Sequence, residues 1–169
     1  MTQEILADVL EPGLRLVICG SAAGARSAHV GAYYAGLQNR FWLTLHEVGL
    51  TPRLLRPEEF RDLPRYGIGL TDIVKHQSGN DRDLRPHALD AERLRARITA
   101  VAPAVLAFNG KRAAQQFLAR QGVDYGTQGE TIVATRLVVL PSTSAAARAF
   151  WDIAPWHALA RLVRESSPS

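Results

Sequence analysis

Short apolar runs that stop at glycine or at a polar residue recur along the chain, and they limit the possible folds more than any other feature. The run Leu14–Cys19 contains β-branched residues and ends at Gly20, which is typical of a buried parallel strand leading into a loop. Comparable runs span residues 67–74, 104–108, 131–134 and 136–140. These runs predict a sheet built from short, largely buried strands.

Helical patterns lie between the apolar runs. Residues 39–48 place Phe41, Leu45 and Val48 on one face before Gly49. Further helices are predicted from Pro57 within 51–63, over 90–101, over 111–121 and from Ala145, with a polar loop at 76–86. Because strands and helices alternate, we expect right-handed crossovers and a three-layer α/β/α fold with a mainly parallel central sheet covered on both faces.

The composition fits one domain and excludes several function classes. With 169 residues, 47% of them apolar, we expect a single domain over 1–169 with an ordered core at about 10–163. No run approaches the roughly 18 apolar residues of a membrane span, and acidic residues near the start argue against a targeting peptide. A cytoplasmic protein without membrane contact is therefore expected.

The cysteine content and the charge limit the possible functions further. The single cysteine, Cys19, excludes an internal disulfide, and its place in a buried strand makes it a poor thiolate nucleophile. The net charge is +4, and lysine occurs only at Lys75 and Lys111, so the positive charge is almost wholly arginine. Arginine suits phosphates and base edges, which weakly favours a nucleic-acid partner.

Open parallel sheets bind ligands in the crevice at the carboxyl ends of their strands. This rule brings three loops together: the loop after Cys19, the segment around Thr71 and Asp72, and the loop after Leu140. The chain's functional residues are expected there.

Several motifs in and around these loops carry a resemblance to a known family. They are Pro12–Gly20, Asn39–Trp42, Gly49–Thr51, Gly69–Thr71, Asn109–Lys111 and Val139–Pro141, followed by Ser144 and Arg148. In order and spacing, about residues 10–150 resemble the mismatch-specific uracil-DNA glycosylases, the branch that includes thymine-DNA glycosylase. The resemblance implies a monomeric enzyme that flips uracil out of DNA and hydrolyses its N-glycosidic bond without a cofactor, releasing free uracil and leaving an abasic site.

Two loops depart from the pattern of that branch. The first loop usually reads Gly-x-Asn-Pro-Gly, whose Asn positions the attacking water, whereas 20–24 reads Gly-Ser-Ala-Ala-Gly and has Ala22 at the Asn position. The last loop usually reads Asn-Pro-Ser-Gly-Leu-Ser-Arg, whose central apolar residue fills the hole left by the flipped base. Here 142–148 reads Ser-Thr-Ser-Ala-Ala-Ala-Arg, with Ala146 at that position.

Asp72 is the candidate for the missing catalytic function. Cleavage of the glycosidic bond passes through an oxocarbenium-like sugar, so a carboxylate beside C1′ stabilises positive charge and accepts a proton from water. Asp72 follows Thr71 at the end of a strand-like segment that borders the same pocket. The alternative is that Asp72 caps a turn or a helix.

The resemblance also implies a base-binding set. Gly20, Ser21 and Ala22 form the pocket floor, with backbone N–H groups near Ser21 and Tyr34 binding the base carbonyls. Tyr34 falls at the position of an aromatic residue that stacks on the flipped base, although the adjacent Tyr33 leaves the register open.

Two further residues have alternative readings. Asn39 supports the pocket by hydrogen bonding or is the N-cap of its helix. Ser142 contacts the base or the sugar, or caps the helix that follows.

DNA contacts are expected from Arg26, Arg148 and the helix N-terminus near Ser144. Because a methyl group at Ala146 is too small to fill a base-sized void, another side chain such as Arg148 plugs it, or the enzyme prefers single-stranded or weakly paired DNA. No histidine pair has metal-ligand spacing with a carboxylate, so no metal is expected, and His29 is most simply an exposed loop residue.

Three other functions stay open at this stage. The first is a glycosylase for another deaminated base, such as hypoxanthine or xanthine, and the second is a DNA-lesion binder without activity. The third is a phosphate-binding α/β enzyme, but 20–24 lacks the ending of a P-loop and a complete Gly-x-Gly-x-x-Gly motif.

Overall fold

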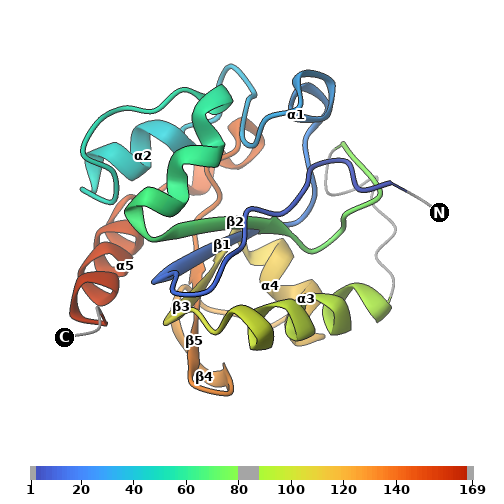
Figure 1. Cartoon of the computed structure of the whole chain (residues 1–169), viewed down its shortest axis with the longest axis vertical. Helices are drawn as coiled ribbons and strands as arrows, with labels where there is room; N and C mark the ends of the chain where they lie inside the picture. The colour runs from blue at the N-terminus through green and yellow to red at the C-terminus, as the bar shows by residue number, and fades with distance from the viewer. Residues whose placement is uncertain (1–2, 80–87, 167–169) are drawn as a thin grey trace.

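The computed structural model describes residues 3–79 and 88–166, and its centre is a five-stranded sheet (Figure 1). The strands are β1 (Leu16–Gly20), β2 (Ile68–Asp72), β3 (Val105–Asn109), β4 (Gly126–Ile132) and β5 (Thr135–Leu140). In space their order is β2-β1-β3-β5-β4. All neighbouring pairs are parallel except β4 with β5, which is antiparallel.

Helices cover both faces of this sheet (Figure 1). They are α1 (Ala25–Val30), α2 (Phe41–Glu47), the 3-10 helix η1 (Pro57–Tyr66), α3 (Ala88–Val101), α4 (Lys111–Leu118), the 3-10 helix η3 (Ala145–Phe150) and α5 (Ala154–Glu165). Among the described residues, none of these helices is long and apolar enough to cross a membrane.

The two faces of the sheet follow from the alternation of side chains along a strand. In β1, Leu16 and Ile18 pack with α2, η1 and α5, whereas Val17 and Cys19 pack with α3 and α4. Because each face is covered, the strands are apolar on both sides and read as continuous apolar runs. The predicted three-layer α/β/α fold with a mainly parallel sheet is confirmed.

Most predicted elements are present with shifted ends, and three differ in kind. β4 begins at Gly126, upstream of the predicted run at 131–134, and Val133 lies in the hairpin turn with a φ of 54°. β4 is a mostly exposed edge strand with a polar sequence, so apolar patterning does not reveal it. The predicted helix from Ala145 is instead η3 followed by α5.

The third difference is α1, which occupies part of the predicted loop after β1. Its six residues are mostly small and lack an apolar stripe, and its N-cap, Gly24, offers no side-chain cap. His29 therefore lies in a helix rather than in a loop, and it is exposed as expected. Residues 80–87, which include most of the predicted polar loop at 76–86, lie outside the described part of the chain.

Candidate active site

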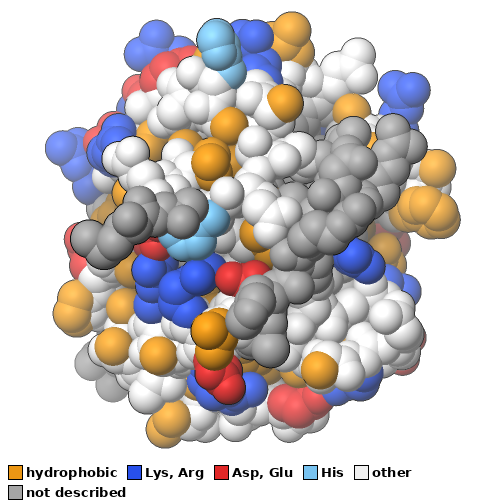
Figure 2. All heavy atoms as spheres, turned by 90° about the vertical axis from the view of Figure 1, so that its right-hand side faces the viewer, with side chains coloured by type: hydrophobic (Ala, Val, Ile, Leu, Met, Phe, Trp, Pro, Cys, Tyr) orange, Lys and Arg blue, Asp and Glu red, His pale blue; other side chains and the backbone are white. Residues whose placement is uncertain are grey.

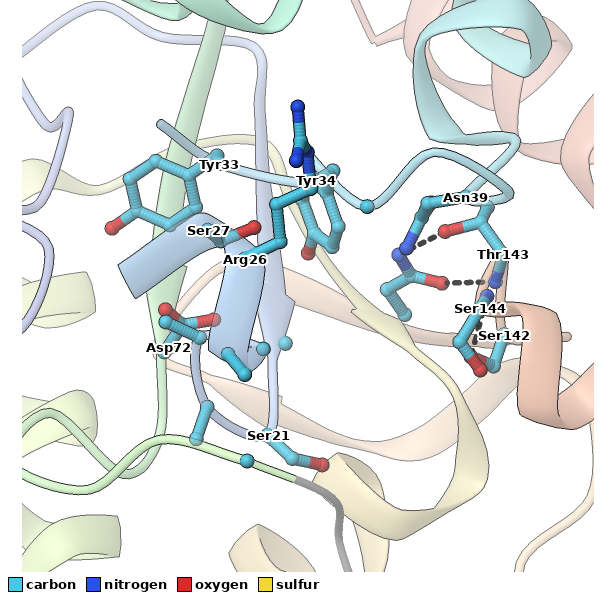
Figure 3. A pocket seen from close by; sticks show the side chains of 18 of the residues that line it. Ser21, Arg26, Ser27, Tyr33, Tyr34, Asn39, Asp72, Ser142, Thr143 and Ser144 are labelled. Carbon is cyan, nitrogen blue, oxygen red and sulfur yellow. Dashed lines mark hydrogen bonds between the residues drawn. The ribbon is translucent and has the colours of Figure 1, made fainter. Parts of the chain in front are cut away.

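A cavity of about 600 Å³ lies where the parallel strands end. Gly20 and Asp72, the last residues of β1 and β2, are paired in register, as are Asn109 and Leu140 at the ends of β3 and β5. Figure 3 shows Asp72 on one side of this space, Ser142 and Ser144 on the other, and Tyr34 above. The three loops predicted to meet do meet there, and the volume is typical of a small-molecule site.

Asp72 closes β2 and lines the cavity with only 6% of its surface exposed. The next two backbone N–H groups, of Ile73 and Val74, donate to the carbonyls of Gly20 and Ser21 at 2.9 and 2.8 Å. These two N–H groups are therefore bonded to carbonyls at the end of β1 and not to the Asp72 carboxylate. Among the described residues, no capping hydrogen bond to the Asp72 carboxylate supports the alternative role.

The burial of Asp72 changes its acid–base behaviour. Removal from water raises the pKa of Asp72 from 3.8 to about 6, with Lys75 opposing the rise and Asp8 adding to it. A carboxyl group with a pKa near 6 exchanges a proton close to neutral pH, as a general base requires.

Gly20 lies directly beneath this carboxylate. A Cβ atom at Gly20 would stand 2.7 Å from Asp72 Oδ1 and 3.1 Å from the Tyr34 hydroxyl. Any side chain at this position would therefore displace one of two groups that line the cavity. The absence of a side chain at the end of β1 is what lets Asp72 and Tyr34 approach each other.

Both tyrosines line the cavity, but their surroundings differ. Tyr33 is 1% exposed and its hydroxyl donates to the carbonyl of Ala7 at 3.1 Å. The Tyr34 ring is stacked on Phe41, with centroids 3.9 Å apart and planes at 21°. Fully buried Phe41 therefore covers one face of the Tyr34 ring, and Tyr34 also lines the cavity.

The Tyr34 hydroxyl is buried and has no hydrogen-bond partner among the described residues. Burial and then the Asp72 charge raise the pKa of Tyr34, and the nearby Asn109 amide opposes the rise without forming a well-directed hydrogen bond. The hydroxyl therefore keeps its proton and remains a donor without an acceptor. Buried polar atoms without partners are rare in folded proteins, so a ligand acceptor at this point is chemically favoured.

On the far side of the cavity, Asn109 fixes the loop that follows β5. Its Nδ2 donates to Thr143 Oγ1 at 2.9 Å, and its Oδ1 accepts the N–H of Thr143 at 3.1 Å. Ser142 Oγ accepts the N–H of Ser144 at 3.2 Å, but Ser144 is itself the N-cap of η3, so this bond stabilises the preceding turn and does not cap the helix. Asn39 Oδ1 accepts the N–H of Phe41 at 3.0 Å, one residue before Arg40, which is the N-cap of α2.

Comparison with known proteins assigns this architecture to a family. The family model described as the uracil DNA glycosylase superfamily matches residues 7–162. The chain belongs to the uracil DNA glycosylase superfamily. A solution NMR structure of a candidate uracil DNA glycosylase from Methanosarcina acetivorans has the same fold, with a TM-score of 0.61 at 18% identity over 96% of this chain and 98% of that one.

Membership of the superfamily supports a DNA glycosylase. Nearly all residues predicted to bind base or DNA line that cavity: Gly20, Ser21, Ala22, Arg26, Tyr34, Asn39, Ser142, Ser144 and Ala146. Arg148 does not line it, and lies exposed on η3. Because η3 is a 3-10 helix of six residues, any dipole that it offers to phosphate near Ser144 is small.

Charged residues that the sequence did not single out also lie close enough to Asp72 to affect its pKa. Lys75, only 1% exposed, pairs with Asp8 at 2.7 Å, and its ammonium group donates to the Tyr33 hydroxyl at 3.2 Å. Asp8 also accepts a hydrogen bond from Thr71 and pairs with Arg97. This ionic cluster (Asp8, Lys75, Arg97) sits behind Asp72 and influences its pKa. The scarcity of lysine was the one available signal.

Other groups in the glycosylase carry less chemistry. Cys19 is fully buried, and burial raises the pKa of its thiol, which agrees with its exclusion as a nucleophile. Among the described residues, no group of three or more His, Cys, Asp or Glu side chains is placed to hold a metal ion.

Proposed function

We propose that this glycosylase flips uracil from DNA into the cavity and hydrolyses its N-glycosidic bond, and that it belongs to the mismatch-specific branch. The observation that carries the proposal is Asp72. Among the described residues that line the cavity, Asp72 is the one carboxylate. It is paired in register with Gly20, which begins the loop where Ala22 replaces the motif asparagine. Asp72 takes over the function of that asparagine.

The chemistry balances with this chain's own groups. The bond between C1′ and the base nitrogen breaks, its electron pair leaves with uracil, and positive charge develops on the sugar. The ionised Asp72 stabilises that charge and accepts a proton from the water whose oxygen bonds to C1′. The uracil anion takes up a proton from solvent and Asp72 gives its proton back to solvent, so the products are an abasic site and free uracil.

The base would be held by stacking and by donors. The free face of Tyr34 provides the stacking surface, and its unpaired hydroxyl is available to a carbonyl oxygen of the base. Figure 2 shows the face of the molecule towards which the carboxyl end of β2 points. Lys and Arg side chains lie at several places on this face, between Asp and Glu side chains. Separated cations of this kind suit contacts with phosphates along a DNA backbone.

Base release from defined oligonucleotides tests the proposal. Single-stranded uracil, U·G and U·A substrates are incubated with the protein, and abasic sites are revealed by alkaline cleavage. Uracil release supports the proposal, and release of hypoxanthine or xanthine alone would replace uracil as the substrate. Tight binding to DNA without release of any base would identify a lesion-binding protein instead. Monomeric state and cytoplasmic location stay predictions.

Tyr34 gives a first mutational prediction. Tyr34→Ala should lower uracil release about tenfold or more, because stacking on an aromatic ring contributes about 1–3 kcal/mol per base. The matched variant Tyr34→Phe keeps the ring and loses only the proposed hydrogen bond to the base, so it should lose less activity than Tyr34→Ala. Because the hydroxyl has no protein partner among the described residues, Tyr34→Phe should not destabilise the fold. Steady-state rates and urea unfolding measure both effects. Equal losses of activity in the two variants would show that the ring is not the binding element.

A further inference from the structure

The rim of the cavity carries an apolar side chain that the fold itself does not use. Leu37 is 85% exposed, the highest exposed fraction among the large apolar side chains of the described residues. It stands in a tight turn closed by a 3.0 Å hydrogen bond from the Asn39 N–H to the Gly36 carbonyl. Turn tips favour glycine, proline or short polar residues, so the turn does not explain a leucine here.

The position of this turn is tied to the cavity. Gly36 and Asn39, the two ends of the turn, both line the cavity, so the turn that carries Leu37 lies at its edge. Ala146, the position where the related enzymes carry an apolar wedge, also lines the cavity and follows the loop after β5. The expected wedge position therefore carries only a methyl group, whereas the neighbouring turn carries a whole leucine side chain.

The turn is also held firmly enough to present a side chain. The Arg40 N–H donates to the Thr143 carbonyl at 3.0 Å, which joins this turn to the loop after β5. On its other side, the Ala35 N–H donates to Ser27 Oγ at 2.9 Å, and Arg26 Nε donates to the Ala35 carbonyl at 3.1 Å. A side chain on a preorganised loop loses little freedom when it inserts.

The surroundings of Leu37 suit DNA. A second, shallower hollow of about 340 Å³ lies beside it, lined among others by Leu43, Arg40 and Trp151. The Arg40 guanidinium lies over the Trp151 ring at 4.9 Å, which places a cation next to two exposed leucines. An apolar group to enter a base stack beside a cation to meet phosphate is the pairing that kinked duplexes require.

The other highly exposed apolar residues are less well placed. Val133, 80% exposed, lies in the β4–β5 turn at the amino end of β5, whereas the cavity lies at the carboxyl end. Phe150, 75% exposed, ends η3 and lines neither hollow.

We propose that Leu37 enters the base stack of duplex DNA and occupies the space left by the flipped nucleotide, in place of a wedge at Ala146. The proposal rests on the proposed function for its substrate, because the flipped base is the one taken into the cavity. It replaces the two earlier readings, insertion of Arg148 or a restriction to single strands.

Leu37→Ala tests this, with Phe150→Ala as the matched loss of an exposed apolar residue. Leu37→Ala should lower uracil release from a U·G duplex about tenfold or more and leave release from a uracil single strand unchanged, since only a duplex has a stack to fill. Phe150→Ala should behave as wild type on both substrates, and Leu37→Met should restore duplex activity. Equal losses on both substrates, or a duplex-selective loss in Phe150→Ala instead, would overturn the proposal.

A second readout does not depend on catalysis. A duplex with 2-aminopurine beside the uracil gains fluorescence when its stack is opened, and wild type should produce this gain while Leu37→Ala does not. If wild type released no uracil from either strand form, the proposed function would fail, and this signal would still decide the role of Leu37. Wild type and Leu37→Ala giving the same signal would overturn it.

Discussion

Asp72→Asn should abolish most of the activity while stabilising the fold. Base release should fall by about a hundredfold or more, because a positioned general base contributes about 10²–10⁴ to the rate and an amide accepts no proton. Stability should rise at the same time, since the variant no longer buries a carboxylate that is costly to ionise. Opposite signs of the two effects identify a group retained for function rather than for folding.

The sign of the stability effect follows from the pKa of Asp72. Burial raises it from 3.8 to about 6, so the folded protein binds the proton more tightly than the unfolded chain does. The favourable contribution is complete below about pH 4 and is lost as the pH rises through 6. Above pH 7 the buried charge costs up to about 3 kcal/mol, which Asp72→Asn would recover.

Urea unfolding and base release at pH 8 measure both effects. The control is Glu58→Gln, the same carboxylate-to-amide change at an exposed position on η1, away from the strand ends. It should change neither quantity appreciably. Wild-type activity should also decline as the pH falls through about 6, when Asp72 takes up its proton. Near-normal turnover in Asp72→Asn would remove Asp72 from the mechanism.

Lys75→Met should have the second largest effect, on stability and on the pH profile together. The ammonium group is buried against Asp8, and loss of one partner of a buried pair costs about 3–5 kcal/mol. Because Asp8 keeps Arg97 and Thr71 as partners, we expect a loss near the lower end of this range. Urea unfolding measures it.

Removal of Lys75 should also shift the acid limb of the pH–rate profile to higher pH. Lys75 lowers the pKa of Asp72 and Asp8 raises it, so Lys75→Met removes the stabilising charge and leaves the opposing one. Asp8→Asn should shift the profile in the other direction and serves as the second variant if Lys75→Met does not fold. The same acid limb in wild type and in both variants would contradict electrostatic control of Asp72 by this cluster.

Local sequence patterns were sufficient for the layers of the fold and for the location of the site. The apolar runs gave β1, β2, β3 and β5, because strands buried on both faces carry few polar residues. The edge strand β4 and the short α1 escaped, since neither has an apolar pattern. The carboxyl-end rule then located the cavity without any knowledge of side-chain contacts.

Within the site, the sequence by itself determined which residues could take part, and the tertiary structure decided how each one is placed. The sequence named Asp72, but the burial and raised pKa of Asp72 depend on the ionic cluster and on the approach of Asp72 and Tyr34 above Gly20. The fold alone likewise showed the different surroundings of Tyr33 and Tyr34, the burial of Lys75 and the exposure of Leu37. The physical reason is that burial and electrostatic environment are set by residues distant along the chain, whereas strand and helix patterns are set by near neighbours.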